Sequence, residues 1–277
     1  MELVSADHAP LAYRRSGPTD GLPVLMLHGY PESSYMWRHL LDPVGAAGFL
    51  AIAPDLANFG DSPDVRPGNW ERQIERLELF RRALDLTNFV LVAHDWGGLI
   101  GLRWILEREL PIAGLVVSCT GFFSDGRWHG LAEQMRTPDH GEELMELLTR
   151  DLLAQALRSE WPGFDDRTID EYWKCLRDRE RRMAQLELYR SGDFEKLAPL
   201  EGRLRELDVP ALALWGARDK YAPVGGAYRF AKLLPQAQVV VVEEAGHFVF
   251  EEAPDRAREA VLALLERVHQ AQRSEPA

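Results

Sequence analysis

Residues 88–106 read NFVLVAHDWGGLIGLRWIL, and this stretch says more about the architecture than any other in the chain. The apolar run at 88–92 predicts a buried strand, and the apolar spacing at 99–106 predicts a helix. Asp95 lies between them, so the pattern indicates a strand, a very tight turn and a helix, with a carboxylate at the apex. Such a turn crowds its own backbone and needs small residues two positions before and after the apex. Ala93 and Gly97 occupy those positions.

Short apolar segments alternate with helical patterns on both sides of this turn. We expect further strands at 11–15, 24–28, 50–54, 113–118, 211–215 and 238–242, and helices at 34–47, at 70–85 and from 254 onward. Strands interleaved with helices predict an α/β fold whose mostly parallel sheet is covered by helices on both faces.

The stretch 121–206 has no buried-strand pattern and is helical in character. We therefore predict a core formed by residues 1–120 and 207–277, with residues 121–206 inserted as a helical cap. A cap in this place covers the carboxyl ends of the strands, where the active sites of open α/β sheets lie.

The composition is that of a globular protein, with 277 residues, 46% of them hydrophobic and 27% charged. Acidic residues outnumber basic ones by 44 to 32, and the net charge of -12 argues against a nucleic-acid partner. Cys119 and Cys175 lack metal-ligand spacing and are read as plain thiols. With no signal-peptide pattern and no apolar run near the roughly 18 residues of a membrane span, we expect a cytoplasmic protein without membrane association. The oligomeric state is left open.

Three chemically active side chains follow predicted strands in the order nucleophile, acid, histidine. Asp95 forms the apex described above, Asp219 follows the strand at 211–215, and His247 follows the strand at 238–242. One aspartate after a strand is usually a turn or a helix cap. All three in this order, together with the tight turn, indicate nucleophilic catalysis.

The loop after the strand at 24–28 supplies a further element. Gly29 permits a backbone conformation that turns amide groups toward the site, and we expect the amides of Tyr30 and Trp96 to form an oxyanion hole. His28 is expected to hydrogen-bond within its own loop and to take no part in catalysis.

This pattern resembles the α/β-hydrolase superfamily, and specifically its branch with an aspartate nucleophile, the haloalkane dehalogenases and epoxide hydrolases. The resemblance implies that Asp95 attacks an sp3 carbon and forms an alkyl ester, which water activated by His247 then hydrolyses. Asp219 would orient His247 and stabilise its cation. The resemblance implies a small apolar electrophile and water as partners, with no metal and no organic cofactor.

The leaving group stays open between a halide and an epoxide oxygen, with a haloalkane, hydrolysed to an alcohol, ranked first. The sequence around Asp95, with Trp96 as a halide donor, resembles one dehalogenase subgroup, as do residues 33–38 and 54–62. Tyr30, however, stands where many dehalogenases have an asparagine that binds halide. Three cap tryptophans are open as substitutes for it: Trp128, Trp161 and Trp173.

An epoxide opens to an alkoxide and needs an acid, and epoxide hydrolases use two cap tyrosines to give vicinal diols. Tyr189 resembles the second of these, and the first should precede it by about 60 residues. No tyrosine occurs between Tyr35 and Tyr172, and Tyr172 could serve only in a rearranged cap. A third reading, a small-ligand-binding protein of the same fold without activity, is weakened by the intact catalytic set.

Overall fold

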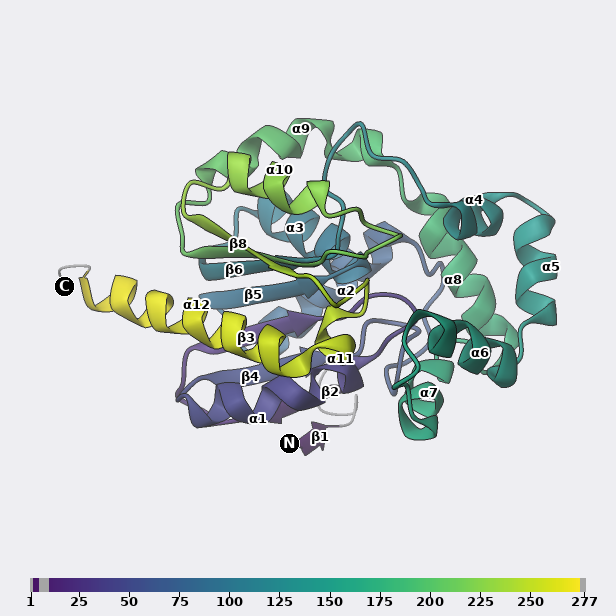
Figure 1. Cartoon of the computed structure of the whole chain (residues 1–277), viewed down its shortest axis with the longest axis horizontal. Helices are drawn as coiled ribbons and strands as arrows, with labels where there is room; N and C mark the ends of the chain where they lie inside the picture. The colour runs from purple at the N-terminus through teal and green to yellow at the C-terminus, as the bar shows by residue number, and fades with distance from the viewer. Residues whose placement is uncertain (1, 5–9, 275–277) are drawn as a thin grey trace.

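The computed structural model describes residues 2–4 and 10–274, and an eight-stranded sheet forms its centre (Figure 1). Its strands are β1 (Glu2–Val4), β2 (Tyr13–Ser16), β3 (Pro23–Leu27), β4 (Leu50–Pro54), β5 (Phe89–His94), β6 (Ile112–Ser118), β7 (Ala211–Gly216) and β8 (Ala237–Val242). They lie side by side in the order β1-β2-β4-β3-β5-β6-β7-β8. The pairings β1–β2 and β2–β4 are antiparallel, and the other five are parallel. The predicted mostly parallel sheet is confirmed; β1 was not predicted.

Helices cover both faces of the sheet, as the alternating pattern predicts. One face carries α1 (Arg38–Ala46) and α12 (Pro254–Ser274), and the other carries α2 (Trp70–Ala83), α3 (Trp96–Arg108) and α10 (Gly225–Leu233). The helix α2 shows why these segments form: the Asn69 side chain caps its first turn, and Trp70, Ile74 and Leu77 bury one stripe. Two short elements, η1 (Ser34–Trp37) and α11 (Val249–Glu252), precede α1 and α12.

The central strand β5 is buried at every position, from Phe89 to His94. A strand with helices on both faces meets no solvent, so residues 89–93 are all apolar and do not alternate with polar ones. Its carboxyl end therefore emerges inside the protein, at the edge of the sheet over which the helical insertion lies.

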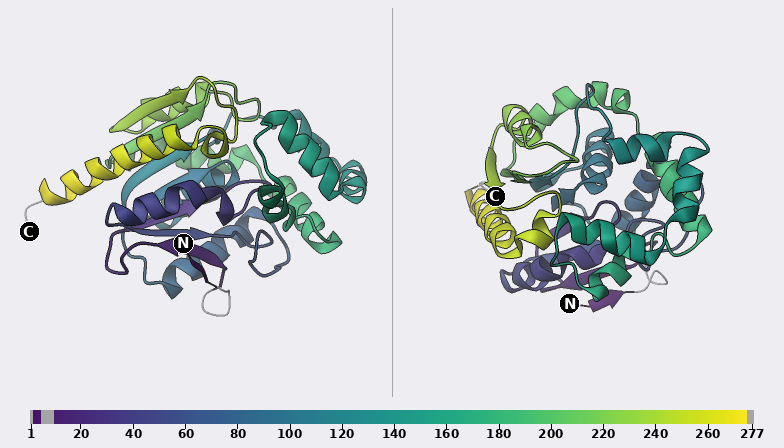
Figure 2. Two further views of the ribbon diagram at one scale, coloured as in Figure 1. Left: turned by 60° about the horizontal axis from the view of Figure 1, so that its bottom comes forward. Right: turned by 45° about the vertical axis from the view of Figure 1, so that its right-hand side comes forward.

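The segment between β6 and β7 is helical and lies largely beyond that edge of the sheet (Figure 2). Its elements are α4 (Gly130–Arg136), α5 (His140–Leu147), α6 (Arg150–Glu160), α7 (Asp166–Trp173), α8 (Arg179–Ser191), η2 (Phe194–Leu197), α9 (Ala198–Glu201) and η3 (Gly202–Glu206). The last two return to the core, where α9 contacts α3 and η3 contacts α10.

The buried Arg181 of α8 fixes the inserted helices to the core. Its guanidinium donates to the Gly60 carbonyl at 2.9 Å and to the Ser62 carbonyl at 2.8 Å. Glu187, further along α8, accepts the Gly68 amide at 2.5 Å. Charge-assisted hydrogen bonds of this kind are stronger than neutral ones, so α8 is held firmly against the loop between β4 and α2.

Among the described residues, no helix combines the length and the apolar character that a membrane crossing requires.

Candidate active site

Asp95 occupies the apex of the tight turn between β5 and α3, with φ 48° and ψ -121°. A non-glycine residue in this region of backbone space is strained, and the strand and helix on either side hold it there. A glycine is required two residues after Asp95, because a Cβ on Gly97 would lie 2.4 Å from the Leu27 carbonyl oxygen. A Cβ on Gly29 would lie 2.3 Å from Asp95 Oδ1, so the loop after β3 can approach the carboxylate only through a glycine.

The structure brings Asp95, Asp219 and His247 together from the loops after three different strands. His247 Nδ1 lies 2.9 Å from Asp219 Oδ2, and His247 Nε2 lies 3.6 Å from Asp95 Oδ2. Asp219 Oδ1 accepts the backbone amides of Tyr221 at 2.8 Å and Ala222 at 2.9 Å. Each Asp219 oxygen therefore has its own partners, and the imidazole lies between two carboxylates.

Burial and charge act against each other on these groups. Burial alone would raise the pKa of Asp95, but the hydrogen bond and charge of His247 lower it to about 2. Burial alone would lower the pKa of His247, but Asp219 and then Asp95 raise it well above the usual value. The pKa of Asp219 is lowered: burial opposes the shift, and the charge of His247 outweighs it. Each residue therefore favours the charged form of the other, the Asp95 carboxylate and the His247 imidazolium.

The Tyr30 amide donates to Asp95 Oδ1 at 2.8 Å, from the loop that the sequence assigned to an oxyanion hole. Trp96, the other predicted donor, is the first residue of α3 and is buried. His28 has the place expected of it: its Nδ1 lies 2.8 Å from the Gly29 carbonyl oxygen, and its Nε2 accepts the Leu56 amide at 2.9 Å.

Two buried groups behind the catalytic histidine were not singled out from the sequence. His94 has its ring centroid 4.9 Å from that of His247, and Glu32 lies 3.5 Å from His94 Nε2. Burial lowers the pKa of His94 to about 3 and raises the pKa of Glu32 well above its usual value, so burial favours the uncharged form of both side chains. Within residues 2–4 and 10–274, Glu32 Oε1 and both His94 ring nitrogens lack hydrogen-bond partners. In the sequence, Glu32 follows Gly29 by three residues and His94 directly precedes Asp95. These positions do not distinguish a role at the site from a role in packing.

Two cavities meet at Asp95, with volumes of about 270 Å³ and about 310 Å³. Asp95, His129, Tyr189 and Tyr221 line both of them. The first is otherwise walled mostly by apolar cap side chains: Leu131, Met135, Leu144, Met145, Leu148, Leu153 and Leu157. Such a space fits a small, mostly apolar ligand with a few polar contacts at its reacting end.

Of the cap aromatics left open by the sequence, Tyr189 and Trp128 reach this region. Tyr189 on α8 is buried, with ring centroids 5.3 Å from Tyr30 and 5.2 Å from Trp96. Trp128 stacks on Trp96 at 5.3 Å. Burial raises the pKa of the Tyr189 phenol well above its usual value, and the Asp95 charge adds to the effect.

The other cap aromatics left open by the sequence, Trp161, Trp173 and Tyr172, line neither cavity. Trp161 packs against Phe164, and Trp173 lies under the guanidinium of Arg182. Tyr172 donates to a buried carboxylate, Glu251, at 2.5 Å and therefore does not replace the first cap tyrosine of epoxide hydrolases.

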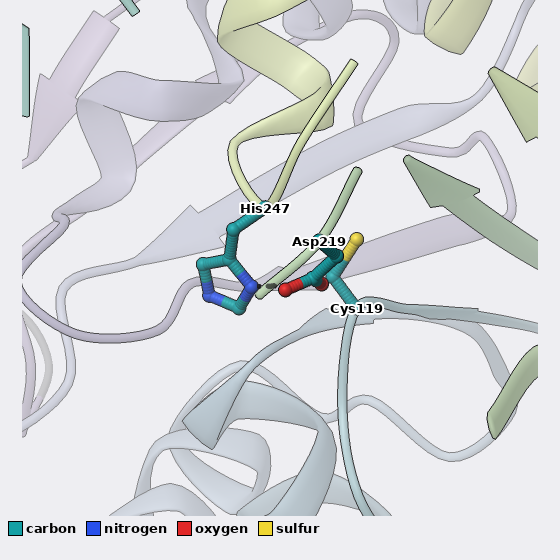
Figure 3. Close-up of side chains that lie close together, drawn as sticks. All are labelled: Cys119, Asp219 and His247. Atoms are coloured by element: carbon teal, nitrogen blue, oxygen red, sulfur yellow. Dashed lines mark hydrogen bonds and ion pairs between the residues drawn. The ribbon is translucent and has the colours of Figure 1, made fainter. Parts of the chain in front are cut away.

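Cys119, Asp219 and His247 place a sulfur, an oxygen and a nitrogen within 4.8 Å of one another, a spacing that could hold a metal ion. Figure 3 shows Asp219 between the His247 ring and the Cys119 thiol. A metal here would have to displace the hydrogen bond between His247 and Asp219. Burial and the charge of Asp219 raise the pKa of the Cys119 thiol well above its usual value, so the thiolate that metals prefer is disfavoured. This donor set fits the catalytic contact better than a metal.

Comparisons with known proteins agree with this architecture. The family described as alpha/beta hydrolase fold matches residues 23–254. A cis-3-alkyl-4-alkyloxetan-2-one decarboxylase from Xanthomonas campestris is 29% identical over 93% of this chain and 92% of its own. A haloalkane dehalogenase from Mycobacterium marinum is 38% identical over 43% of this chain and 41% of its own. The crystal structure of a haloalkane dehalogenase from Bradyrhizobium elkani has a TM-score of 0.83 at 24% identity, over 98% of both chains, and shows likeness of fold.

Proposed function

Because this chain belongs to the alpha/beta hydrolase fold family, we propose that it is a hydrolase in which Asp95 attacks an alkyl carbon and forms an ester. The observation that supports this most strongly is the position of the Asp95 carboxylate. Oδ1 accepts the Tyr30 amide, and Oδ2 lies 3.6 Å from the nitrogen of a histidine that is itself held by Asp219. A carboxylate at the apex of such a turn, beside a base and an amide donor, is arranged for covalent catalysis.

The proposed reaction has two steps. In the first, an Asp95 oxygen bonds to the substrate carbon, the bond from that carbon to the leaving group breaks, and the leaving group departs with the electron pair. In the second, His247 takes a proton from water and hydroxide adds to the ester carbonyl carbon. The carbonyl oxygen then carries negative charge, which the Tyr30 amide stabilises, with Trp96 as the second proposed donor. Expulsion of the product alcohol restores the Asp95 carboxylate.

The first step also prepares the base for the second. His247 owes part of its raised pKa to the Asp95 charge, and esterification removes that charge. The imidazolium then releases its proton to solvent more easily, and neutral Nε2 becomes available to activate water. Asp219 remains charged and continues to hold Nδ1.

The donors around Asp95 favour an oxygen leaving group. This reverses the ranking from the sequence alone, which placed a haloalkane before an epoxide. Tyr189 lines both cavities beside Asp95, and its raised pKa keeps the phenol protonated. A phenol can protonate an alkoxide, whereas a halide needs no proton. We therefore place a small apolar epoxide first. The relative from Xanthomonas, matched over nearly its whole length, is named for another strained oxygen ring.

A haloalkane is the second candidate, supported by Trp96 next to the nucleophile and by the relatives named haloalkane dehalogenase. Trp128, which lines one of the two cavities, stacks on Trp96 with 25° between the ring planes. Tyr30 replaces the asparagine that would otherwise bind the halide.

The test uses His247→Ala, which should form the ester but not hydrolyse it. The variant is incubated separately with styrene oxide and 1,2-dibromoethane, and the masses of the intact protein and the Asp95 peptide are recorded. We expect the hydroxyphenylethyl adduct to form faster than the bromoethyl adduct. The matched control is His247→Ala combined with Asp95→Asn, which should gain no mass. Bromoethyl labelling alone would support the dehalogenase, and no Asp95 adduct with either reagent would refute the proposal.

A further inference from the structure

His129 lies where the cap meets the nucleophile and has no role in the chemistry described so far. It directly precedes α4 and lines both cavities together with Asp95 and Tyr189. Its ring centroid lies 4.9 Å from that of Tyr221, whose own ring lies 5.1 Å from His247. His129 is thus part of the wall that encloses the reacting carbon.

The position of His129 in the sequence also matches a position in the epoxide-hydrolase pattern. It precedes Tyr189 by 60 residues, and no tyrosine occurs between Tyr35 and Tyr172. At the point where the epoxide-hydrolase pattern has its first cap tyrosine, this chain therefore has a histidine. The structure places that histidine beside Tyr189 at the same two cavities.

One hydrogen bond determines which ring nitrogen of His129 carries the proton. Nδ1 accepts the backbone amide of Ala132 at 3.3 Å and so caps the first turn of α4. A nitrogen that accepts carries no proton, so in the neutral ring the proton is on Nε2. Burial lowers the pKa of His129, against the opposite pull of Asp95, and the ring is neutral near neutral pH. His129 therefore offers a neutral N–H donor.

We propose that His129 Nε2–H donates a hydrogen bond to the leaving oxygen while Asp95 opens the epoxide. This inference rests on the proposed function and adds a catalytic residue to it. As the bond from Asp95 to carbon forms and the ring carbon–oxygen bond breaks, negative charge develops on the oxygen. His129 stabilises that charge without losing its proton, and Tyr189 transfers its phenolic proton to the oxygen. The Tyr189 phenolate regains a proton from solvent, which balances the proton that the His247 imidazolium releases before it accepts one from water.

The competing explanation is that His129 is only a helix cap, and His129→Ser separates the two roles. Serine is a good N-cap and offers no donor at the distance of Nε2. In the His247→Ala background, we expect His129→Ser to slow ester formation from styrene oxide by about 100-fold, as for loss of one oxyanion donor. Ester formation from 1,2-dibromoethane, whose leaving group needs no strong donor, should change by less than about 3-fold. His129→Tyr should recover part of the rate with the epoxide.

The matched control is Thr149→Ala, which removes the cap of α6 while Thr149 lines neither cavity. It should leave both alkylation rates unchanged. Equal slowing of both reagents by His129→Ser, or no slowing, would overturn the donor role while leaving the Asp95 chemistry intact. Failure of His247→Ala itself to form an ester refutes the proposed function separately, before His129 is changed.

A second measurement does not depend on turnover. Nitrogen-15 NMR of the imidazole, assigned by comparison with His129→Ser, should show a protonated Nε2 and a bare Nδ1 at neutral pH. A proton on Nδ1 would refute the inference whatever the substrate.

Discussion

Replacing Asp219 with asparagine tests the proposed division of labour between the two reaction steps. Asp219 Oδ1 accepts the Tyr221 and Ala222 amides, and only an oxygen can accept them. The asparagine oxygen must therefore keep this position, and its NH₂ group takes the place of Oδ2, 2.9 Å from His247 Nδ1. An NH₂ group donates, so Nδ1 must accept and the ring proton moves to Nε2. That tautomer cannot take a proton from water.

The size of the expected loss in activity follows from the loss of the correct His247 tautomer. The same acid-to-amide change in serine hydrolases lowers kcat by about 10⁴-fold, through the wrong histidine tautomer. A 10⁴-fold loss corresponds to about 5.4 kcal/mol, at about 1.36 kcal/mol for each factor of ten. Asp219 has a fully buried side chain, so we expect a loss of about 10³- to 10⁴-fold in ester hydrolysis. Ester formation does not use the base and should change by less than about 10-fold.

The assay is rapid-quench mass spectrometry with styrene oxide in excess. Asp219→Asn should show a burst of ester on Asp95 equal to the enzyme concentration, followed by very slow diol release. The control is Asp208→Asn, the same change at an exposed carboxylate that accepts a hydrogen bond from Gln236. If Asp219→Asn slowed both steps equally, or left diol release intact, the assignment of Asp219 to the base would be wrong.

Three further predictions follow from the structure. Tyr189→Phe should slow ester formation from styrene oxide by about 10²-fold and leave the reaction with 1,2-dibromoethane nearly unchanged, measured in His247→Ala. Arg38→Met leaves Glu251 buried without its two 2.6 Å hydrogen bonds and should lower the free energy of unfolding by about 3–5 kcal/mol, measured by urea titration. Because His247 lowers the pKa of Asp95 to about 2, ester formation by the protein with His247 intact, measured as the rapid-quench burst, should not fall between about pH 8 and pH 5. A group with a lowered pKa stays ionised above that pKa, so a drop in this range would show that the Asp95 carboxylate is protonated there and contradict the prediction.

The sequence predicted the features that depend on local pattern. The run before Asp95 could only be a buried strand, and Gly97 could only serve a tight turn. The separate loops that hold Asp219 and His247 converge because parallel strands end at one edge of the sheet. For these residues, spacing along the chain is sufficient to fix their place in space.

The positions of the cap side chains could not be predicted from the sequence, because tertiary packing places the cap helices. Nothing in the sequence separates Tyr189, which reaches the nucleophile, from Tyr172, which binds Glu251. The epoxide-hydrolase pattern has a tyrosine where this chain has His129, so residue type alone does not identify His129 as a site residue. Glu32 and His94 were passed over because burial, which gives them their shifted pKa values, is invisible in a single sequence.

The two cavities that meet at Asp95 have a stereochemical consequence. An epoxide with a substituent on each ring carbon can place one substituent in each cavity, and exchanging the two presents the other carbon to Asp95. The choice of attacked carbon, and with it the configuration of the diol, therefore depends on how the two chambers differ in shape. Remodelling Met135, which lines one chamber only, offers a route to the opposite enantiomer without touching the reacting groups.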